Sequence, residues 1–343
     1  MESLTTILER AGQGSPWAFL GLFLVASLLM VWRLEAMTAN GLGGTVLGTL
    51  VMPYCSGLGN LIFAWFSARQ GGDGRDVVIN CFVNNTTNLT LLIGIPTLLF
   101  GMNIAGGDAG DSGGKKKDKK GKGKPDKGGQ QREVNRLSLL LTLVAVLFFT
   151  GTVWALSRDG KLDFNDGLVL VGVFLFWQCF HVYDVLKTNV QQNRTLGWKM
   201  VIDLMLLGVG AYGVYVSTDW LNQWLGRQHS GFVNAENIGW LSGWLMVLPN
   251  AVLAMYYGWR RKPDVTYSSQ VGDGHICIPL CLGLFALFHP ITVTPTLILG
   301  CQVIVGAGVV HFLFMAILGR LPRLVGLLLI VAYGLFLYRG LIK

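Results

Sequence analysis

Stretches of about 20 mostly apolar residues recur along the chain, each long enough to cross a bilayer core of about 30 Å as a helix. Hydrophobic residues make up 52% of the 343 residues and charged residues 13%, whereas soluble domains average about 25% charged. The pattern predicts an all-α polytopic membrane protein with about ten transmembrane helices. The expected spans are 16–36, 42–69, 77–101, 137–157, 166–187, 198–217, 238–259, 273–289, 294–318 and 323–341.

The third apolar stretch is interrupted by five consecutive polar residues, Asn84-Asn85-Thr86-Thr87-Asn88. A polar group without a partner in hydrocarbon costs roughly 2–7 kcal/mol, so this cluster must face protein, water or a ligand. Hydrogen bonds between helices would explain one Asn, whereas three within five residues favour a ligand-lining role. Asn84 and Asn88 share a face of a regular helix and Asn85 does not, so a common site requires local unwinding.

The chain repeats one pattern of breaks in two halves. The second and seventh spans each contain a proline, and a short charged loop and a span with a polar start follow each proline. The polar stretches beginning at Val83 and Gly272 each lie eleven residues before a glycine. An odd number of spans per half inverts the second half, and inverted repeats with broken helices are typical of secondary transporters. The prolines and glycines are Pro53, Gly94, Pro249 and Gly283.

In these features the chain resembles the sodium/calcium exchanger family, within the cation/calcium antiporter superfamily. Each repeat of that family carries a Gly-Thr-Ser-Leu-Pro-Glu stretch and then a Gly-Asn-x-x-Gly-Ser-Asn-x-x-Asn stretch. The matching residues are Gly48, Thr49, Pro53, Asn80, Asn84, Asn85 and Asn88 in the first half and Pro249, Ser269, Gly272, Asp273 and Gly274 in the second. The resemblance implies two inverted five-helix repeats and secondary active cation antiport, with alternating access around a midplane polar site.

The chain departs from the family at two positions that bear on the ion. The family's two glutamates supply most of the negative charge at its cation site, and Tyr54 and Asn250 stand there in this chain. By this alignment Asp273 is the carboxylate left near the expected centre. Calcium usually takes six to eight oxygens, with carboxylates balancing its charge. The residues therefore suit a monovalent cation or a proton-coupled reaction better than calcium, and the candidate transported ions are Na⁺, H⁺ and Ca²⁺.

The expected ion-binding residues come from both halves. Asp273 would supply charge, unless it is a surface residue following the polar stretch Ser268-Ser269-Gln270. Tyr54 would donate a hydrogen bond or fill the space of a lost glutamate. His275 would carry a coupled proton or be a structural histidine. The full expected set is Asn84, Asn85, Thr87, Asn88, Asn250, Asp273, Tyr54 and His275.

A Lys- and Gly-rich segment, 105–135, holds eight of the 27 Lys and Arg residues between Lys115 and Lys127 and is expected to be disordered. It would attract anionic lipid or serve as a tether that fixes topology. The Lys and Arg bias places it in the cytoplasm and both termini outside, in the plasma membrane or a bacterial inner membrane. The expected divisions are 1–15, an amino-terminal segment; 16–104, spans one to three; 105–135; 136–190, spans four and five; and 191–343, the second repeat.

Other chemistries are not expected. The six cysteines lie in apolar spans, where Cys behaves as a small hydrophobe, so no disulfides are predicted. His275, Cys277 and Cys281 are close in sequence, but without a second ligand cluster they predict no transition-metal site, and no resident cofactor is expected. Enzyme motifs are missing from the sequence, and the expected partners are membrane lipids and small cations rather than nucleic acid. The alternative is a transport-inactive protein of the same fold that acts through partners; the oligomeric state is left open.

Overall fold

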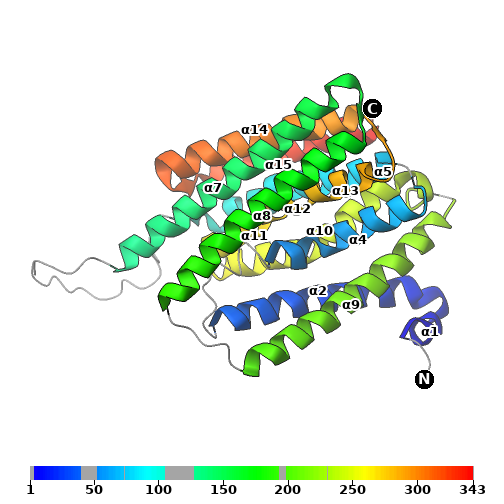
Figure 1. The fold of residues 1–343 in the computed structure, drawn as a ribbon, viewed down its shortest axis with the longest axis horizontal. Coiled ribbons are helices and arrows are strands. Elements are labelled where there is room, and N and C mark those ends of the chain that lie inside the picture. Colours follow the sequence, from blue (N-terminus) through cyan, green and yellow to red (C-terminus); the bar gives the residue numbers. More distant parts are fainter. Residues whose placement is uncertain are drawn as a thin grey trace, which may run out of the picture.

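The chain folds into a bundle of long helices with axes that run mostly along one direction (Figure 1). The computed structural model describes residues 4–39, 52–72, 74–104, 127–192, 198–229 and 231–342. Within these residues, seven helical stretches are long and apolar enough to cross a membrane. Large apolar side chains such as Phe176, Trp198 and Ile317 are exposed on the outside of the bundle, as expected for a surface that faces lipid.

The first half runs from the amino terminus to the end of α8. Its elements are α1 (Leu4–Glu9), η1 (Gly12–Gly14), α2 (Ser15–Ala39), α4 (Met52–Arg69), α5 (Gly74–Thr86), η3 (Thr87–Leu91), α6 (Leu92–Phe100), β1 (Met102–Asn103), α7 (Lys127–Leu156), η4 (Ser157–Asp159), β2 (Lys161–Leu162) and α8 (Phe164–Gln192). The helical run α5–η3–α6 carries the polar cluster. Its central turn, η3, is π-helical.

The second half repeats this order. Its elements are α9 (Trp198–Gly226), η5 (Ala235–Asn237), α10 (Ile238–Trp259), α11 (Pro263–Gly272), α12 (Gly274–Ile276), η6 (Cys277–Cys281), α13 (Leu282–Ala286), β3 (Ile291–Thr292), α14 (Pro295–Leu318), β4 (Arg320–Leu321), α15 (Arg323–Leu337) and η7 (Tyr338–Ile342). The run from α11 to α13 corresponds to α5–η3–α6 and also contains a π-helical turn, η6. We call these two runs the broken runs.

Equivalent contacts join the two halves. Strand β1 pairs antiparallel with β4, and β2 pairs antiparallel with β3. The strand after each broken run therefore pairs with the turn between the last two helices of the other half. The helices of Pro53 and Pro249 also pack on the broken run of the other half, since α4 contacts η6 and α13 while α10 contacts α5 and α6.

The two glycines that mark the sequence repeat sit at equivalent close contacts. A Cβ on Gly94 of α6 would lie 2.9 Å from the carbonyl oxygen of Gly326 in α15. A Cβ on Gly283 of α13 would lie 3.2 Å from the carbonyl oxygen of Gly167 in α8. The repeat inferred from sequence spacing thus corresponds to one packing arrangement made twice, with the two halves inverted.

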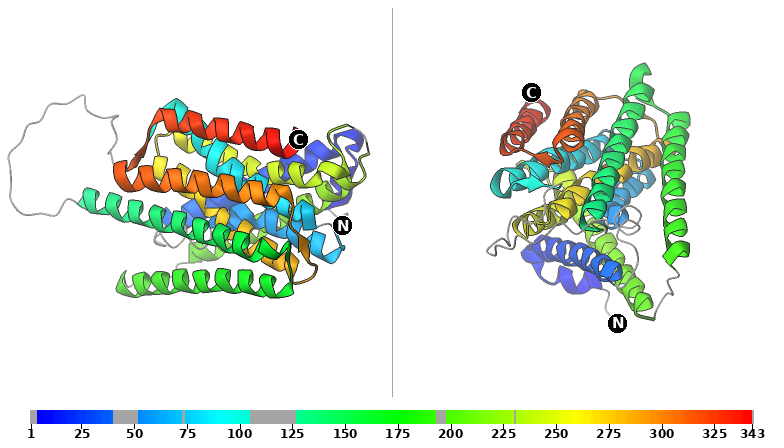
Figure 2. Two further views of the ribbon diagram at one scale, coloured as in Figure 1. Left: turned by 90° about the horizontal axis from the view of Figure 1, so that it is seen from above. Right: turned by 90° about the vertical axis from the view of Figure 1, so that its left-hand side faces the viewer.

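The first broken run lies in the interior of the bundle. In its membrane-length stretch, Gly74–Phe100, 89% of an apolar 18-residue segment is buried, compared with 28–56% of the corresponding segments in the other six stretches. Helices α2 and α9 pack along one another at one side of the bundle, away from α14 and α15 (Figures 1 and 2). An ion pair of 3.5 Å between Arg33 and Asp203 joins these two helices. The polar cluster is therefore surrounded by protein rather than lipid, as its composition predicts.

Several predicted boundaries differ from the structure, and the sixth span, expected to end at residue 217, continues to Gly226 in α9. The eighth span was expected from residue 273, but its helical run begins at Pro263, because the polar residues of α11 face protein rather than water. The disordered segment was expected to extend to residue 135, but α7 begins at Lys127, since residues 130–136 include good helix formers that extend the apolar helix. Residues 42–51 of the second span and 105–126 of the Lys-rich segment lie outside the described residues.

Candidate cation site

A π-helical turn interrupts each broken run next to its polar residues. The turns are Thr87–Leu91 and Cys277–Cys281, and such turns occur frequently at functional sites. In the first turn, Thr87 Oγ1 donates to the Val83 carbonyl oxygen at 2.6 Å, and such back-bonding bends helices. In the second, Pro279 has no N–H to donate along the helix. Both halves therefore contain the local unwinding that a shared site requires.

Four side chains from both halves form one buried hydrogen-bonded network. Asn88 Nδ2 donates to Asp273 Oδ2 at 2.9 Å and to Asn84 Oδ1 at 3.0 Å. Asn250 Nδ2 also donates to Asp273 Oδ2 and lies 3.5 Å from Asn88 Oδ1. All four side chains are at most 1% exposed. We call Asn84, Asn88, Asn250 and Asp273 the amide–carboxylate network.

Helix breaks place the second-half members of the network. Asn250 follows Pro249 inside α10, and a proline leaves the carbonyl one turn earlier without its helical donor. The Asn250 backbone carbonyl oxygen accepts from Gln270 Nε2 at 3.3 Å. Asp273 lies between α11 and α12, in the middle of its broken run, and is 0% exposed. The interpretation of Asp273 as a surface loop residue is therefore excluded.

Several buried oxygens around the network have no hydrogen-bond partner within the described structure. The oxygens are Asn85 Oδ1, Asn250 Oδ1 and Gln270 Oε1, and the Asn84 Nδ2 donor also has no partner there. Buried polar atoms are normally satisfied, so a group of unsatisfied oxygens requires an explanation. Neutral oxygens are ligands for hard cations. Together with one carboxylate they form an oxygen-rich environment of low charge.

The remaining expected site residues contact other parts of the bundle. Asn85 Nδ2 donates to the Cys81 carbonyl oxygen at 2.7 Å, and Asn85 Oδ1 lies 3.1 Å from where a Cβ on Gly274 would stand. Asn85 is therefore beside the network without belonging to it. Thr87 Oγ1 contacts the Tyr333 hydroxyl at 3.2 Å. The backbone of Tyr54 lies in α4, and its side chain lies outside the described part of the chain.

His275 contacts helices α7 and α8. Its Nε2 atom is 3.1 Å from the Thr142 carbonyl oxygen in α7. Its ring packs edge-on against Phe149 and Trp177, with centroid distances of 5.7 and 5.4 Å. These partners belong to α7 and α8, so the His275 ring packs on that pair of helices.

Sequence reasoning missed Gln270, which contacts the Asn250 backbone next to the site. Gln270 is 0% exposed, as is Thr86 of the polar cluster. Gln270 lies one helical turn before Asp273, so extending the eighth span towards Pro263 would have found it. Thr86 belongs to the polar cluster but was given no role. His311 of α14, a structural histidine by its isolation in the sequence, donates from Nε2 to the Leu89 carbonyl oxygen in the π turn at 2.7 Å. Within the described residues, no group of three His, Cys, Asp or Glu residues is arranged to hold a metal ion.

Comparisons with known proteins agree with this architecture. The chain is similar over most of its length to solved structures of the sodium-calcium exchanger NCX_Mj, at 16–18% sequence identity and a TM-score of 0.61. The match to the crystal soaked with 2.5 mM Na⁺ and 10 mM Sr²⁺ covers 92% of this chain and 94% of that one. The match to the crystal soaked with 10 mM Na⁺ and zero Ca²⁺ covers 96% and 99%. No curated protein sequence matches the chain significantly.

The family assignment rests on the sequence itself. The family model described as sodium/calcium exchanger protein matches residues 17–183 and 202–341. These ranges include both broken runs and helices α4 and α10. This is a family of integral membrane transporters rather than enzymes. The chain therefore belongs to the sodium/calcium exchanger family of membrane cation antiporters.

Proposed function

We propose that this chain is a secondary active antiporter that carries a monovalent cation, Na⁺ or H⁺, in preference to Ca²⁺. The observation that carries the proposal is the amide–carboxylate network, in which one carboxylate, Asp273, is held by amides from both halves. A monovalent cation balances that single charge. Calcium would leave a net positive charge in a buried site, where an unbalanced charge is strongly disfavoured.

The amides of Asn88 and Asn250 could face a cation with their oxygens in place of their N–H groups, while all four residues of the network stay where they are. Asp273 Oδ2 accepts hydrogen bonds from the side-chain amides of Asn88 and Asn250. A half turn of either amide would replace its N–H groups with its carbonyl oxygen. The Asn250 Oδ1 atom already has no hydrogen-bond partner in the described structure. The same residues would therefore stabilise the site both with and without its ion, as a carrier requires.

Alternating access would require part of the bundle to move around this site. The network is attached to both broken runs and to α10, which pack closely on each other. Helices α2 and α9 pack mainly along one another at the side of the bundle. We assign the rocking motion to the α2–α9 pair and a fixed position to the network.

The orientation of the chain is part of the proposal. The excess of Lys and Arg supports an orientation with the Lys-rich segment in the cytoplasm and both termini outside. The membrane would be a plasma membrane or a bacterial inner membrane, with lipid and small cations as the partners. Labelling of single cysteines introduced near residues 3 and 120 with an impermeant reagent on intact cells would test this orientation. The proposed orientation predicts that the cysteine near residue 3 reacts and that the cysteine near residue 120 does not.

Ion flux tests the proposed activity directly. The full chain in proteoliposomes should carry Na⁺ in one direction when an imposed H⁺ gradient drives H⁺ in the other. Asp273→Asn should abolish that Na⁺ flux. Asp264→Asn is a matched control, because Asp264 lies on the first turn of α11, away from the network. Flux of Ca²⁺ with no flux of a monovalent cation would overturn the choice of ion. Unchanged Na⁺ flux in Asp273→Asn would overturn the site.

A second candidate function rests on the completeness of the network. The amides of Asn88 and Asn250 already satisfy Asp273 without a cation, and both family glutamates are replaced. These observations favour a transport-inactive member of the family that acts through partners. Saturable stabilisation by one cation would count against this candidate, and stability independent of every cation would support it.

A further inference from the structure

A pocket of about 470 Å³ lies at the surface of the bundle, where α14 begins and η7 ends. Its walls come from the turn before α14, the first two turns of that helix, and Arg339 and Gly340 of η7. Figure 2 shows α14 and α15 side by side at the outside of the bundle. The apolar segments of their membrane-length stretches have the smallest buried shares among the described stretches, 33% and 28%. We call this feature the α14–η7 pocket.

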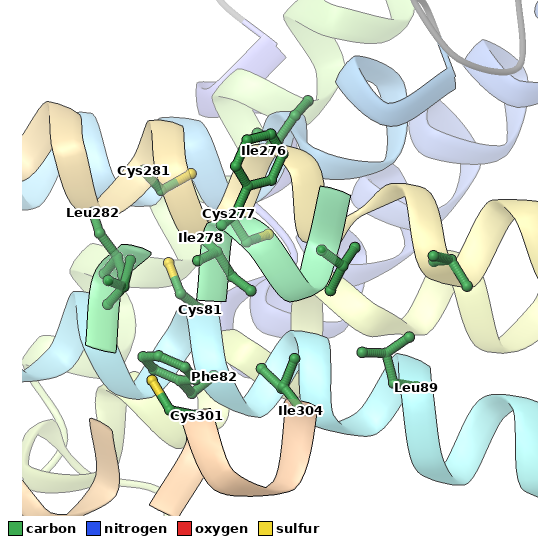
Figure 3. Close-up of a cluster of buried hydrophobic side chains, with 14 of the residues drawn as sticks. Cys81, Phe82, Leu89, Ile276, Cys277, Ile278, Cys281, Leu282, Cys301 and Ile304 are labelled. Atoms are coloured by element: carbon green, nitrogen blue, oxygen red, sulfur yellow. The ribbon is translucent and has the colours of Figure 1, made fainter. Parts of the chain in front are cut away.

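The inner side of α14 is packed against the first broken run. Figure 3 shows Cys301 and Ile304 of α14 beside Phe82 of α5. A Cβ on Gly300 would lie 2.4 Å from the Phe82 ring. In contrast, Ile298 lines the pocket and is 41% exposed. A ligand of the α14–η7 pocket therefore enters from the outer surface, which faces lipid.

One cation stands in the wall of the pocket. Arg339 is exposed and forms no ion pair with any residue that the structure describes. The other lining side chains are apolar, except for the neutral Thr294, Thr296 and Gln302. Thr294 Oγ1 accepts from the Leu297 N–H at 3.3 Å, which leaves its own hydroxyl hydrogen to donate. Since no carboxylate is among the lining residues, the pocket is complementary to a single anionic group.

Aromatic rings mark this end of the bundle as a membrane interface. A Cβ on Gly340 would lie 2.7 Å from the Trp240 ring, so that ring lies directly behind the pocket wall. The Trp240 ring contacts the Trp244 ring at a centroid distance of 5.8 Å. Tyr338, next to Arg339, is 48% exposed. Trp and Tyr are enriched at the depth of the lipid headgroups, and Arg at a helix end extends to the same depth.

Exposed apolar faces lead from the pocket along both helices. Three side chains on each helix recur at helical spacing and are 36–58% exposed. They are Ile298, Val305 and Val309 on α14 and Leu328, Val331 and Leu335 on α15. Hydrocarbon chains can lie on such faces, whereas a soluble anion gains nothing from them. The surroundings of the pocket therefore fit an amphipathic anion better than a free one.

We propose that the α14–η7 pocket binds a membrane phospholipid. Arg339 pairs with the phosphate, because a guanidinium can bind two phosphate oxygens through parallel N–H groups. The acyl chains lie on the exposed faces of α14 and α15. The pocket volume lies within the range of small-ligand sites, about 300–1,000 Å³. The inference does not rest on the proposed ion, because no member of the amide–carboxylate network lines the pocket.

Native mass spectrometry of the purified full-length chain in detergent tests the site. Titration with phosphatidylglycerol should show one lipid that binds more tightly than the rest. Arg339→Gln should weaken this first binding about fivefold, which corresponds to about 1 kcal/mol for one basic residue. Arg323→Gln is the matched control, because Arg323 is exposed at the other end of α15 and does not line the pocket. Equal weakening by both variants would show a general attraction of lipid to basic residues and would overturn the site.

A second pair of variants tests the pocket itself rather than its charge. Ile298→Trp would fill the pocket and should also weaken the first lipid. Ile317→Trp should not, because Ile317 is 72% exposed near the far end of α14. An unchanged first lipid in Ile298→Trp would contradict the proposed position.

The choice of ligand is tested with two probes. A diacylglycerol with the same acyl chains lacks the phosphate and should bind at least about fivefold more weakly than phosphatidylglycerol, on the same arithmetic. Equal binding of the two lipids would overturn the role of Arg339. Displacement of the lipid by an equal concentration of inorganic phosphate would assign the pocket to a free anion instead. Asp273→Asn should bind the lipid as the unmodified chain does, which separates this site from the proposed transport site.

Discussion

Asn84 and Asp273 occupy equivalent positions in the two halves, and the amide of Asn88 bonds to both. Each lies ten residues before the glycine of its half, Gly94 or Gly283. Asn88 Nδ2 donates to Asn84 Oδ1 at 3.0 Å and to Asp273 Oδ2 at 2.9 Å. The inverted repeat thus brings one position of each half to a common point, with a carboxylate on one side and its neutral counterpart on the other.

The contacts of Asn88 with both residues predict that the carboxylate can be moved from position 273 to position 84 without loss of cation binding. Asp273→Asn should remove cation-dependent stabilisation, and adding Asn84→Asp should restore it, because Asn88 contacts both positions. A cation at a hundred times its Kd stabilises the folded state by about 2.7 kcal/mol. Thermal unfolding with and without Na⁺ would measure the effect. A double variant no more responsive than Asp273→Asn would show that the two positions do not share an ion.

The close contact at Gly94 predicts a packing defect on substitution. Gly94→Ala would place a Cβ 2.9 Å from the Gly326 carbonyl oxygen, and overpacking of this kind costs about 1–3 kcal/mol. Gly172→Ala in α8 is a matched control, since nothing lies within 4 Å of its Cβ position. There the expected change is a gain of about 0.5–1 kcal/mol. Thermal unfolding in detergent measures both, and equal midpoints would contradict the contact.

The hydrogen bond from His311 to the π turn predicts a positioning role. His311→Phe would leave the Leu89 carbonyl oxygen buried without its donor, at a cost of about 1–3 kcal/mol. His311→Gln keeps an N–H donor and should retain more of the stability. Because Asn88 precedes Leu89 in the same turn, His311→Phe should also weaken Na⁺-dependent stabilisation. Equal behaviour of the two variants would show that the ring's shape, and not its N–H, is required.

Much of the site could be predicted from residue type alone. Asn84, Asn88 and Asp273 are expensive in a membrane-length apolar run unless they face protein or a ligand, and the structure brings them together with Asn250. The paired spacing to Gly94 and Gly283 likewise predicts the inverted repeat. These inferences succeed because solvation cost and spacing are properties of the sequence itself.

The direction of each side chain could not be predicted in the same way. His275 is two residues from Asp273, yet it packs against α7 and α8, because its direction depends on how the chain winds between α11 and η6. The π turns have no simple sequence signature, so the directions of the Asn85 and Thr87 side chains could not be predicted either. The start of α11 was missed because its Ser-Ser-Gln stretch is polar enough to read as a loop although Gln270 is fully buried.

The most direct test of the single-carboxylate site is an ion screen of thermal stability on the full chain and on Asp273→Asn. A site built on Asp273 predicts saturable stabilisation by Na⁺, or by H⁺ as a pH dependence, that disappears in Asp273→Asn and persists in the control Asp264→Asn. Stabilisation by Ca²⁺ stronger than by any monovalent cation, or an unchanged response in Asp273→Asn, would contradict it.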